Sequence, residues 1–289
     1  MLHIDELKSK LLSFDKAFAE RRIIAAIKQY FEKTGVKYAI LGLSGGVDSS
    51  VAFVLTVKAL GKERVKCLIM PHTKITPKGD IEDAFQLATQ HGVEPIFIEI
   101  DAIAEGFRNR VVDEGIDVDR VTYGNILART RMILLYTFAN SFNGLVVGSG
   151  DKSELLLGYF TKYGDGGVDI LPIGDLYKTQ VRELARHLGI PERIAYKPSS
   201  PRLWPDQTAE NELGASYEVI DPILYALVEL RKTVEEVLEI KGVSKELIKS
   251  ILRRVFSSEH KRRFPLIPKL SSGLTIGIDW RIPRISDIA

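Results

Sequence analysis

The chain has 289 residues, of which 45% are hydrophobic and 27% are charged. This length and balance are typical of a globular protein that buries a sizeable core. The formal net charge of +2 is too small to indicate a nucleic-acid-binding surface. No apolar stretch is long enough to cross a bilayer, so neither nucleic acid nor a membrane is an expected partner.

The single cysteine, Cys67, excludes a disulfide framework and a cysteine-based zinc site within one chain. It lies in the apolar run VKCLIM, where we expect it to be a buried small hydrophobic residue. The N-terminal residues mix charges without an uninterrupted apolar stretch, so no signal peptide is predicted. A reducing cytoplasm is the expected location.

Hydrophobic spacing predicts helices that alternate with strands. Residues 3–34 repeat apolar side chains at spacings near three and four, which predicts one amphipathic helix ended by Gly35. Short apolar runs predict buried strands at 37–43, 65–71, 94–100, 144–150 and 169–174. Between or after them, helices are predicted at 49–60, 79–92, 123–142 and 177–189. Residues 218–257 should be mostly helical, and 271–284 an irregular tail or edge strand.

Nearly all-apolar strands that alternate with helices indicate a parallel sheet covered on both faces. The right-handed crossover rule then favours a doubly wound, mainly parallel α/β fold. We expect one domain over residues 1–289 with a helical C-terminal segment, 213–289, because no repeat or linker interrupts the pattern. In such sheets ligands bind beyond the carboxyl ends of the strands, and the functional site is predicted there.

The stretch YAILGLSGGVDSSVAF at 38–53 permits two interpretations of the loop after the first strand. Residues 42–46, GLSGG, match the G-x-S-x-G elbow that presents a nucleophilic serine. That elbow needs an oxyanion donor from an earlier strand-to-helix loop. Only one predicted strand precedes Ser44, so the nucleophile interpretation is disfavoured.

The alternative is a loop that holds phosphate. Gly45 and Gly46 leave backbone N–H groups unobstructed, and Ser44 and Ser49 add hydroxyl donors. Asp48 or Ser49 can cap the following helix, whose positive end faces the same anion. The loop lacks the lysine and spacing of a Walker A motif. Asp48 beside a polyphosphate is either a Mg²⁺ ligand or only a helix cap.

The motif SGGVDSS resembles the pyrophosphate loop of the N-type ATP pyrophosphatases, which cleave ATP to AMP and pyrophosphate while forming an adenylate. Their fold is the adenine nucleotide alpha hydrolase-like sheet. A second block, 148–191, contains GYFTKYGDGG and closely resembles the NAD synthetase family. NILARTRM at 125–132 and SSEHKRR at 257–263 also match that family. The variant GSGDKSE at 148–154 is closer to archaeal-type members than to many bacterial ones.

The resemblance implies a role for each matching residue. ATP would be contacted by Gly42, Leu43, Ser44, Gly45, Gly46, Val47, Asp48, Ser49, Ser149, Lys178 and Ser200. Deamido-NAD would be contacted by Arg129, Lys162, Asp169, His260 and Lys261. Asp48 and Glu154 would bind Mg²⁺, and the catalytic residues would be Asp48 and Lys178.

The implied reaction converts deamido-NAD, ATP and ammonia to NAD, AMP and pyrophosphate through an acyl adenylate. Free ammonia is the expected donor, because the chain leaves no room for an amidase domain. The family is homodimeric with its substrate near the subunit interface, so the resemblance implies a homodimer for this chain. A tRNA-thiolating enzyme is the alternative, disfavoured by the single cysteine and small net charge. A binding module without catalysis is disfavoured because Asp48 and Glu154 are both present.

Overall fold

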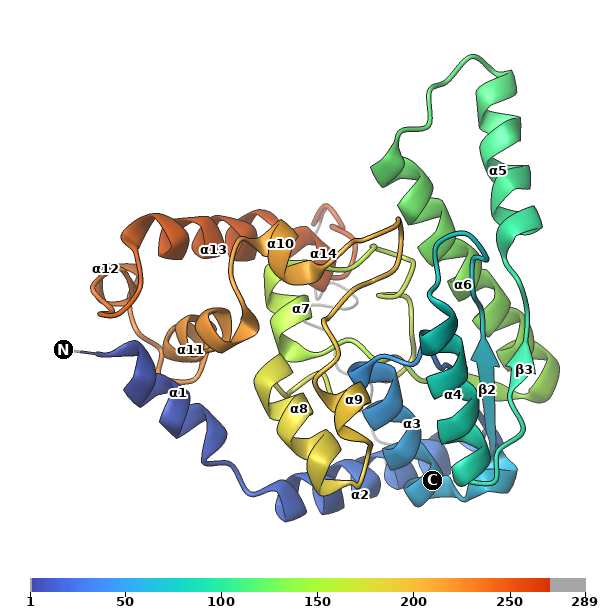
Figure 1. Cartoon of the computed structure of the whole chain (residues 1–289), viewed down its shortest axis with the longest axis horizontal. Helices are drawn as coiled ribbons and strands as arrows, with labels where there is room; N and C mark the ends of the chain where they lie inside the picture. Colours follow the sequence, from blue (N-terminus) through green and yellow to red (C-terminus); the bar gives the residue numbers. More distant parts are fainter. Residues whose placement is uncertain (1, 271–289) are drawn as a thin grey trace.

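The computed structural model describes residues 2–270, which form a parallel four-stranded sheet with helices on both faces (Figure 1). The strands are β1 (Tyr38–Gly42), β2 (Val65–Ile69), β3 (Ile96–Phe97) and β4 (Gly144–Val146), in the order β3-β2-β1-β4. The chain moves outward from β1 through β2 and β3 and then crosses to β4 on the other side of β1. The predicted doubly wound α/β fold is confirmed.

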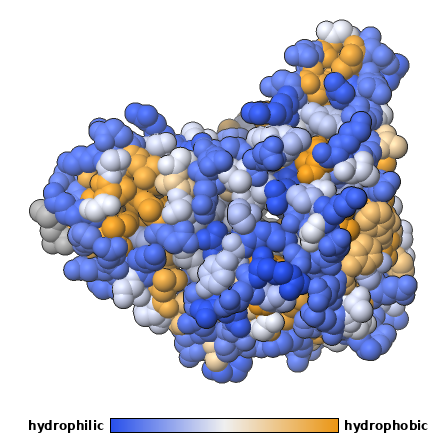
Figure 2. Space-filling view, in the orientation of Figure 1, coloured by the Kyte–Doolittle hydropathy of each residue, from blue (hydrophilic) through white to orange (hydrophobic). Residues whose placement is uncertain are grey.

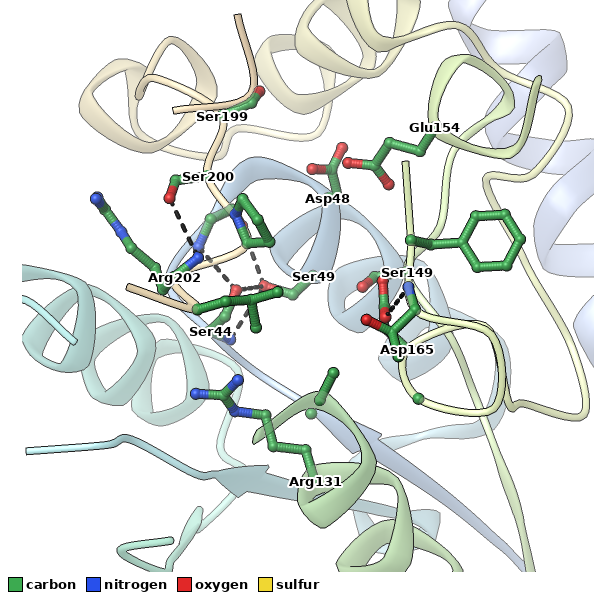
Figure 3. A pocket seen from close by; sticks show the side chains of 18 of the residues that line it. Ser44, Asp48, Ser49, Arg131, Ser149, Glu154, Asp165, Ser199, Ser200 and Arg202 are labelled. Carbon is green, nitrogen blue, oxygen red and sulfur yellow. Dashed lines mark hydrogen bonds between the residues drawn. The ribbon is translucent and has the colours of Figure 1, made fainter. Parts of the chain in front are cut away.

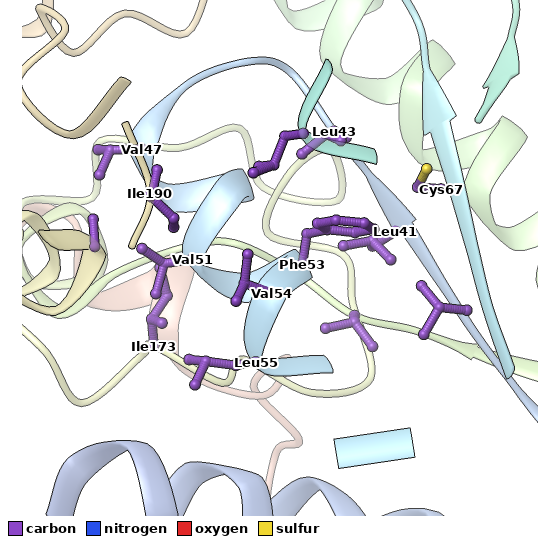
Figure 4. Close-up of a cluster of buried hydrophobic side chains, with 14 of the residues drawn as sticks. Leu41, Leu43, Val47, Val51, Phe53, Val54, Leu55, Cys67, Ile173 and Ile190 are labelled. Atoms are coloured by element: carbon purple, nitrogen blue, oxygen red, sulfur yellow. The ribbon is translucent and has the colours of Figure 1, made fainter. Parts of the chain in front are cut away.

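One face of the sheet packs against helices from both halves of the chain. These helices are α2 (Lys16–Thr34), α3 (Val47–Leu60), α4 (Lys78–Gln90), α8 (Lys178–His187) and α9 (Glu192–Ala195). Figure 4 shows the centre of this core, where Phe53 of α3 lies beside Leu41 of β1. Cys67 is fully buried here, as predicted, and burial raises the pKa of its thiol to about 12.

The opposite face of the sheet carries α5 (Asp101–Asp113) and α6 (Arg120–Phe142). The far end of α5 and the start of α6 project away from the sheet as an arm (Figure 1). α5 was not predicted, although Ile103, Phe107 and Val111 follow the four-residue spacing of a helix; these side chains are exposed in the structure.

A second hydrophobic core joins the N-terminal helix to the helices near the end of the described chain. Its main helices are α1 (Ile4–Leu12), α10 (Ala209–Leu213), α11 (Tyr217–Val228), α12 (Val234–Leu238) and α13 (Lys245–Ser257). The predicted helical character of 218–257 is confirmed. Two short helices, α7 (Lys152–Leu157) and α14 (Glu259–Arg262), lie where this core meets the sheet-bearing part (Figure 1).

The predicted single helix at 3–34 is wrong, because the chain breaks between α1 and α2. Asp15 caps α2, with its Oδ1 accepting from the backbone N–H of Phe18 at 2.9 Å. Each helix then faces a different core. Gly35 ends α2 in the left-handed conformation, as predicted, with φ 68°.

Two predicted strands, β1 and β2, form with slightly shorter bounds, whereas the other three are much shorter or missing. Only Ile96–Phe97 of 94–100 and Gly144–Val146 of 144–150 form strands, and Pro95 supplies no N–H to extend the former. The fifth strand at 169–174 is wrong, because only one bridge, Val147 to Ile170, forms there. The prediction for 271–284 lies outside the described residues. None of the described helices combines the length and apolarity needed to span a membrane.

Candidate active site

A cavity of about 370 Å³ lies at the carboxyl ends of β1, β2 and β4 (Figure 3). Its wall includes the loop after β1, one side of α6, the loop after α7 and the segment 197–207. Because the chain turns from β1 toward β2 on one side and reaches β4 on the other, this is the topological switch point. The cavity therefore lies where the sequence predicts the functional site.

The loop after β1 ends where α3 begins at Val47, with Gly46 as the N-cap and no side chain in the capping position. The predicted cap by Asp48 or Ser49 is therefore wrong. Ser49 Oγ instead accepts from the backbone N–H of Ser44 at 3.1 Å and pairs with its hydroxyl at 2.9 Å. The first N–H groups of α3 have no partner within the helix, and the positive helix end faces the cavity.

Gly45 is held against α4 by contacts that only glycine permits. Its φ is +76°, and a Cβ would lie 2.0 Å from the carbonyl oxygen of Asp80. Lys197 Nζ donates to the Gly45 carbonyl at 2.8 Å and pairs with Asp80 at 2.8 Å and Asp83 at 2.7 Å. The sequence pattern identified Gly45 but not the contacts of Lys197, which lies far from Gly45 and Asp80 in the chain.

An acidic cluster faces the same cavity around a buried lysine. Lys178 Nζ lies 2.5 Å from Asp48 Oδ2, 3.0 Å from Asp151 Oδ2 and 2.8 Å from Glu154 Oε1. Asp151 also caps α7, its Oδ1 accepting from the Glu154 N–H at 2.8 Å. Asp151 was missed as a candidate, although the D-x-x-E spacing of a capping box marks it.

Burial sets the protonation of this cluster. It raises the pKa of Asp151 and of Glu154, and Lys178 only partly opposes that effect. Burial by itself would lower the pKa of Lys178, but Asp151, Asp48 and Glu154 outweigh it and hold that pKa well above its ordinary value. Lys178 therefore stays charged, as one cation among three carboxyl groups.

The three carboxyl groups fit a divalent cation. They offer oxygen atoms that all lie within 4.8 Å of one another. Asp48 Oδ1 and Asp151 Oδ2 are buried without a well-directed hydrogen bond, so each has a free acceptor position. Carboxylate oxygens are the ligands that Mg²⁺ prefers. The structure brings together Asp48 and Glu154, as predicted from the sequence, and adds Asp151.

The remaining residues predicted to contact ATP divide into two groups. Ser149 and Ser200 line the cavity, as do all members of the β1 loop from Gly42 to Ser49 except Gly45. Lys178 is fully buried behind the carboxyl groups and does not line the cavity. Its contact with ATP stays a prediction.

Of the five residues predicted to contact deamido-NAD, four lie near one another, but one of these belongs to the wall of the cavity. Lys261 lines it. Lys162 Nζ donates to the carbonyl of His260 at 3.1 Å, and Arg129 Nη2 donates to the carbonyl of Lys162 at 3.3 Å. These contacts bring four of the five predicted residues near one another.

Asp169 lies apart from the other four residues predicted to contact deamido-NAD. Its carboxylate accepts from the backbone N–H of Val146 at 2.7 Å and from the hydroxyl of Tyr136 at 3.1 Å. It does not line the cavity. In this structure Asp169 holds the end of β4, and its contact with a substrate stays a prediction.

Several cavity residues were not found from the sequence. They include Asn125, Arg131, Thr161, Asp165, Arg202 and Trp204. Asn125 and Arg131 lie within the matched block NILARTRM, but the pattern alone does not say which of its side chains face a ligand.

The sheet order, the phosphate-type loop at the switch point and the facing acidic cluster define a nucleotide-binding α/β protein with a candidate metal site. The NAD synthase family model matches residues 20–265, and the chain belongs to this family. The NH(3)-dependent NAD(+) synthetase of Staphylothermus marinus is 51% identical over 259 residues, 90% of this chain and 93% of that protein. The Methanosarcina acetivorans enzyme of the same name is 48% identical, covering 90% of this chain and 100% of that protein.

Solved structures show the same fold. The NMN synthetase of Francisella tularensis superposes with a TM-score of 0.78 at 32% identity, covering 89% of this chain and 100% of that one. The NH3-dependent NAD synthetase of Campylobacter jejuni, solved with nitrate, superposes with a TM-score of 0.73 at 32% identity, with the same coverage.

Proposed function

We infer that this protein converts deamido-NAD to NAD with ammonia and ATP, the activity that the names of its NAD synthetase relatives state. One observation carries the inference within this chain: the free N-terminal end of α3 and the acidic cluster around Lys178 face one cavity. A polyphosphate and a divalent cation would meet between them. The tRNA-thiolating alternative is not supported, because the family model matches most of the chain.

The chemistry explains why ATP is needed. The carboxylate of deamido-NAD is a poor electrophile, because its negative charge repels a nucleophile. Transfer of AMP to this carboxylate forms an acyl adenylate and releases pyrophosphate. Ammonia then attacks the carbonyl carbon, the nitrogen loses a proton and AMP leaves with the carboxylate oxygen. The N–H groups at the start of α3 and the hydroxyls of Ser44 and Ser49 would hold the phosphates.

Asp48, Asp151 and Glu154 would hold Mg²⁺. When bound there, the ion supplies positive charge beside the phosphates. Lys178 would keep the three carboxyl groups together, because its ammonium contacts each of them. This is a positioning role for Lys178. Asp48 lies in the first turn of α3 and also belongs to the acidic cluster.

The second substrate would lie along the edge formed by Arg129, Lys162, His260 and Lys261, where cationic side chains suit its phosphates. The protein is proposed to act as a homodimer. Exposed apolar residues gather on the arm that α5 and the start of α6 form: Ile103, Phe107, Val111, Val112, Ile116 and Val121. Figure 2 shows hydrophobic residues at the tip of this arm, and such a patch is typical of a protein interface. The cytoplasmic location stays a prediction.

The activity test uses purified protein with ATP, Mg²⁺, deamido-NAD and ammonium. NAD, AMP and pyrophosphate should appear in equal amounts. A parallel reaction with the mononucleotide analogue of deamido-NAD is needed, because a structural relative is named an NMN synthetase. Absence of all three products, or faster turnover of the mononucleotide, would refute the proposed substrate.

A further inference from the structure

Among the described residues, the basic side chains that line the cavity differ in what they contact. These side chains are Arg131, Lys197, Arg202 and Lys261. Lys197 and Arg202 pair with the carboxylate of Asp80 at 2.8 and 2.9 Å. Lys261 Nζ donates to two backbone carbonyls, each at 2.7 Å. Arg131 is the exception, because most of its donors are not used.

Arg131 makes one hydrogen bond, from Nε to the carbonyl of Met70 at 3.1 Å. Among residues 2–270, no carboxylate oxygen lies within 4.0 Å of its guanidinium. Asp165 is the acidic residue that interacts electrostatically with Arg131. Its carboxylate accepts a hydrogen bond from the Thr161 N–H at 2.8 Å and not from the guanidinium. Figure 3 shows the side chain of Arg131 extending from α6 across the cavity toward Ser44. Its two Nη groups therefore face the cavity.

A charged side chain that is partly buried without a partner of opposite charge carries an uncompensated desolvation free energy. Desolvation lowers the pKa of Arg131 to about 10, which still leaves the guanidinium charged at neutral pH. Such a cation is stabilised when an anion pairs with it, and the guanidinium fork suits two oxygens of one phosphate. The position of Arg131 therefore favours a bound anion.

The helix geometry separates Arg131 from Arg129. Two residues correspond to about 200° around a helix, so the two arginines lie on nearly opposite sides of α6. Arg129 is exposed and contacts Lys162 at the edge assigned to deamido-NAD. Arg131 lies across from the Ser44 loop and is fixed to Met70 just beyond the end of β2.

We propose that Arg131 contacts a phosphate of bound ATP from the α6 side of the cavity, opposite the loop after β1. This assignment rests on the proposed function, because it takes ATP as the nucleotide held by that loop. Two features favour ATP over deamido-NAD: the guanidinium faces the phosphate loop, and Arg129, the α6 cation assigned to deamido-NAD, lies on nearly the opposite side of that helix.

The test measures the affinities of ATP, adenosine and deamido-NAD separately by calorimetry, without turnover. Arg131→Met should weaken ATP binding by about ten- to a hundredfold, the effect of losing a charge-assisted hydrogen-bonding pair. The affinity for adenosine, which has no phosphate, should stay unchanged. Arg131→Lys should restore part of the ATP affinity, because it keeps the charge. Arg253→Met, an exposed arginine of α13, is the matched control and should bind ATP like the wild type.

Other outcomes would overturn the assignment. Unchanged ATP affinity in Arg131→Met would show that no phosphate contacts Arg131. An equal loss of ATP and adenosine affinity would indicate a damaged cavity, and a loss confined to deamido-NAD would assign Arg131 to the other substrate. If the wild type bound no ATP, the proposed function would fail together with this assignment. If the wild type bound ATP and Arg131→Met bound it equally well, only the assignment of Arg131 would be overturned.

Discussion

Asp151 is the buried member of the acidic cluster and had no predicted role. Asp151→Asn keeps an oxygen that can accept from the Glu154 N–H but removes one negative charge from the candidate cation site. We expect the affinity for Mn²⁺, used as a spectroscopic substitute for Mg²⁺, to fall about tenfold or more, with a smaller effect on the unfolding temperature. Asp175→Asn is the control, because this carboxylate is 96% exposed. Equal Mn²⁺ affinity in both variants would exclude Asp151 as a ligand.

Asp221 of α11 supports that cluster from behind. Its Oδ1 accepts from the Ser153 hydroxyl at 2.6 Å and its Oδ2 from the Thr179 N–H at 2.8 Å. The Ser153 hydroxyl in turn accepts from the Lys178 N–H at 2.9 Å. Burial raises the pKa of Asp221 to about 7, against the lowering effect of these hydrogen bonds. One carboxyl group therefore joins α11 to α7 and α8.

This pKa predicts a pH-dependent stability. The unfolded chain loses the Asp221 proton near pH ~4, whereas the folded protein loses it near pH 7. Between these values the folded state binds more protons, so Asp221 makes the free energy of unfolding fall as the pH rises. Asp221→Asn removes that contribution. The free energy of unfolding of the variant, relative to that of the wild type, should therefore rise by a few kcal/mol between pH ~4 and ~7. Urea denaturation across this pH range measures the free energy of unfolding of both proteins. If the two free energies changed in parallel with pH, the prediction would be wrong.

The element that shapes the cavity is the loop joining β1 to α3, and its tightest point is Gly45. Alanine at Gly45 would combine a positive φ with a Cβ only 2.0 Å from the Asp80 carbonyl oxygen. Gly35→Ala is the control, because Gly35 also has a positive φ but nothing within 4 Å of an added Cβ. Gly35→Ala should cost about 1 kcal/mol of unfolding free energy, and Gly45→Ala at least about 2 kcal/mol more. Equal losses in chemical denaturation would show that α4 shifts freely.

Elements with a strong local signal were predicted, and those fixed by distant contacts were not. β1 and α3 follow from a continuous apolar run between glycines, because both are buried on nearly every side. α5 is an exception, because Ile103, Phe107 and Val111 carry a helical spacing that was not recognised, and these side chains are exposed in the single chain. The ion pair between Lys197 and Asp80 joins residues more than a hundred positions apart, so no local spacing in the sequence predicts it.

At the scale of the whole molecule, the doubly wound topology explains which site residues the sequence could supply. Asp48 and Glu154 follow two strands that end side by side, so a parallel sheet brings them together. Lys178 reaches the same place through the start of α8, whose position depends on packing against α3 and α11. The motifs thus predicted the location of the cluster, whereas the enclosure of Lys178 by three carboxyl groups required the tertiary structure.

The arm of α5 and α6 carries a group of apolar side chains that the single chain leaves uncovered. Phe107 and Ile116 are 49% and 59% exposed, and they lie with Val111 and Val112 on one projecting structure. A second copy packed on this arm would bury that surface, and a symmetric dimer would use the same residues on both subunits.

Placing a charge in such an interface should separate the subunits, because a buried unpaired carboxylate is strongly unfavourable. The double variant Phe107→Glu with Val111→Glu should sediment as a monomer at concentrations where the wild type is a dimer. Phe256→Glu is the control, because Phe256 is 58% exposed on α13, away from the arm, and the variant should remain dimeric. A monomeric wild type would refute the dimer itself, whereas a dimeric double variant would move the interface to another surface.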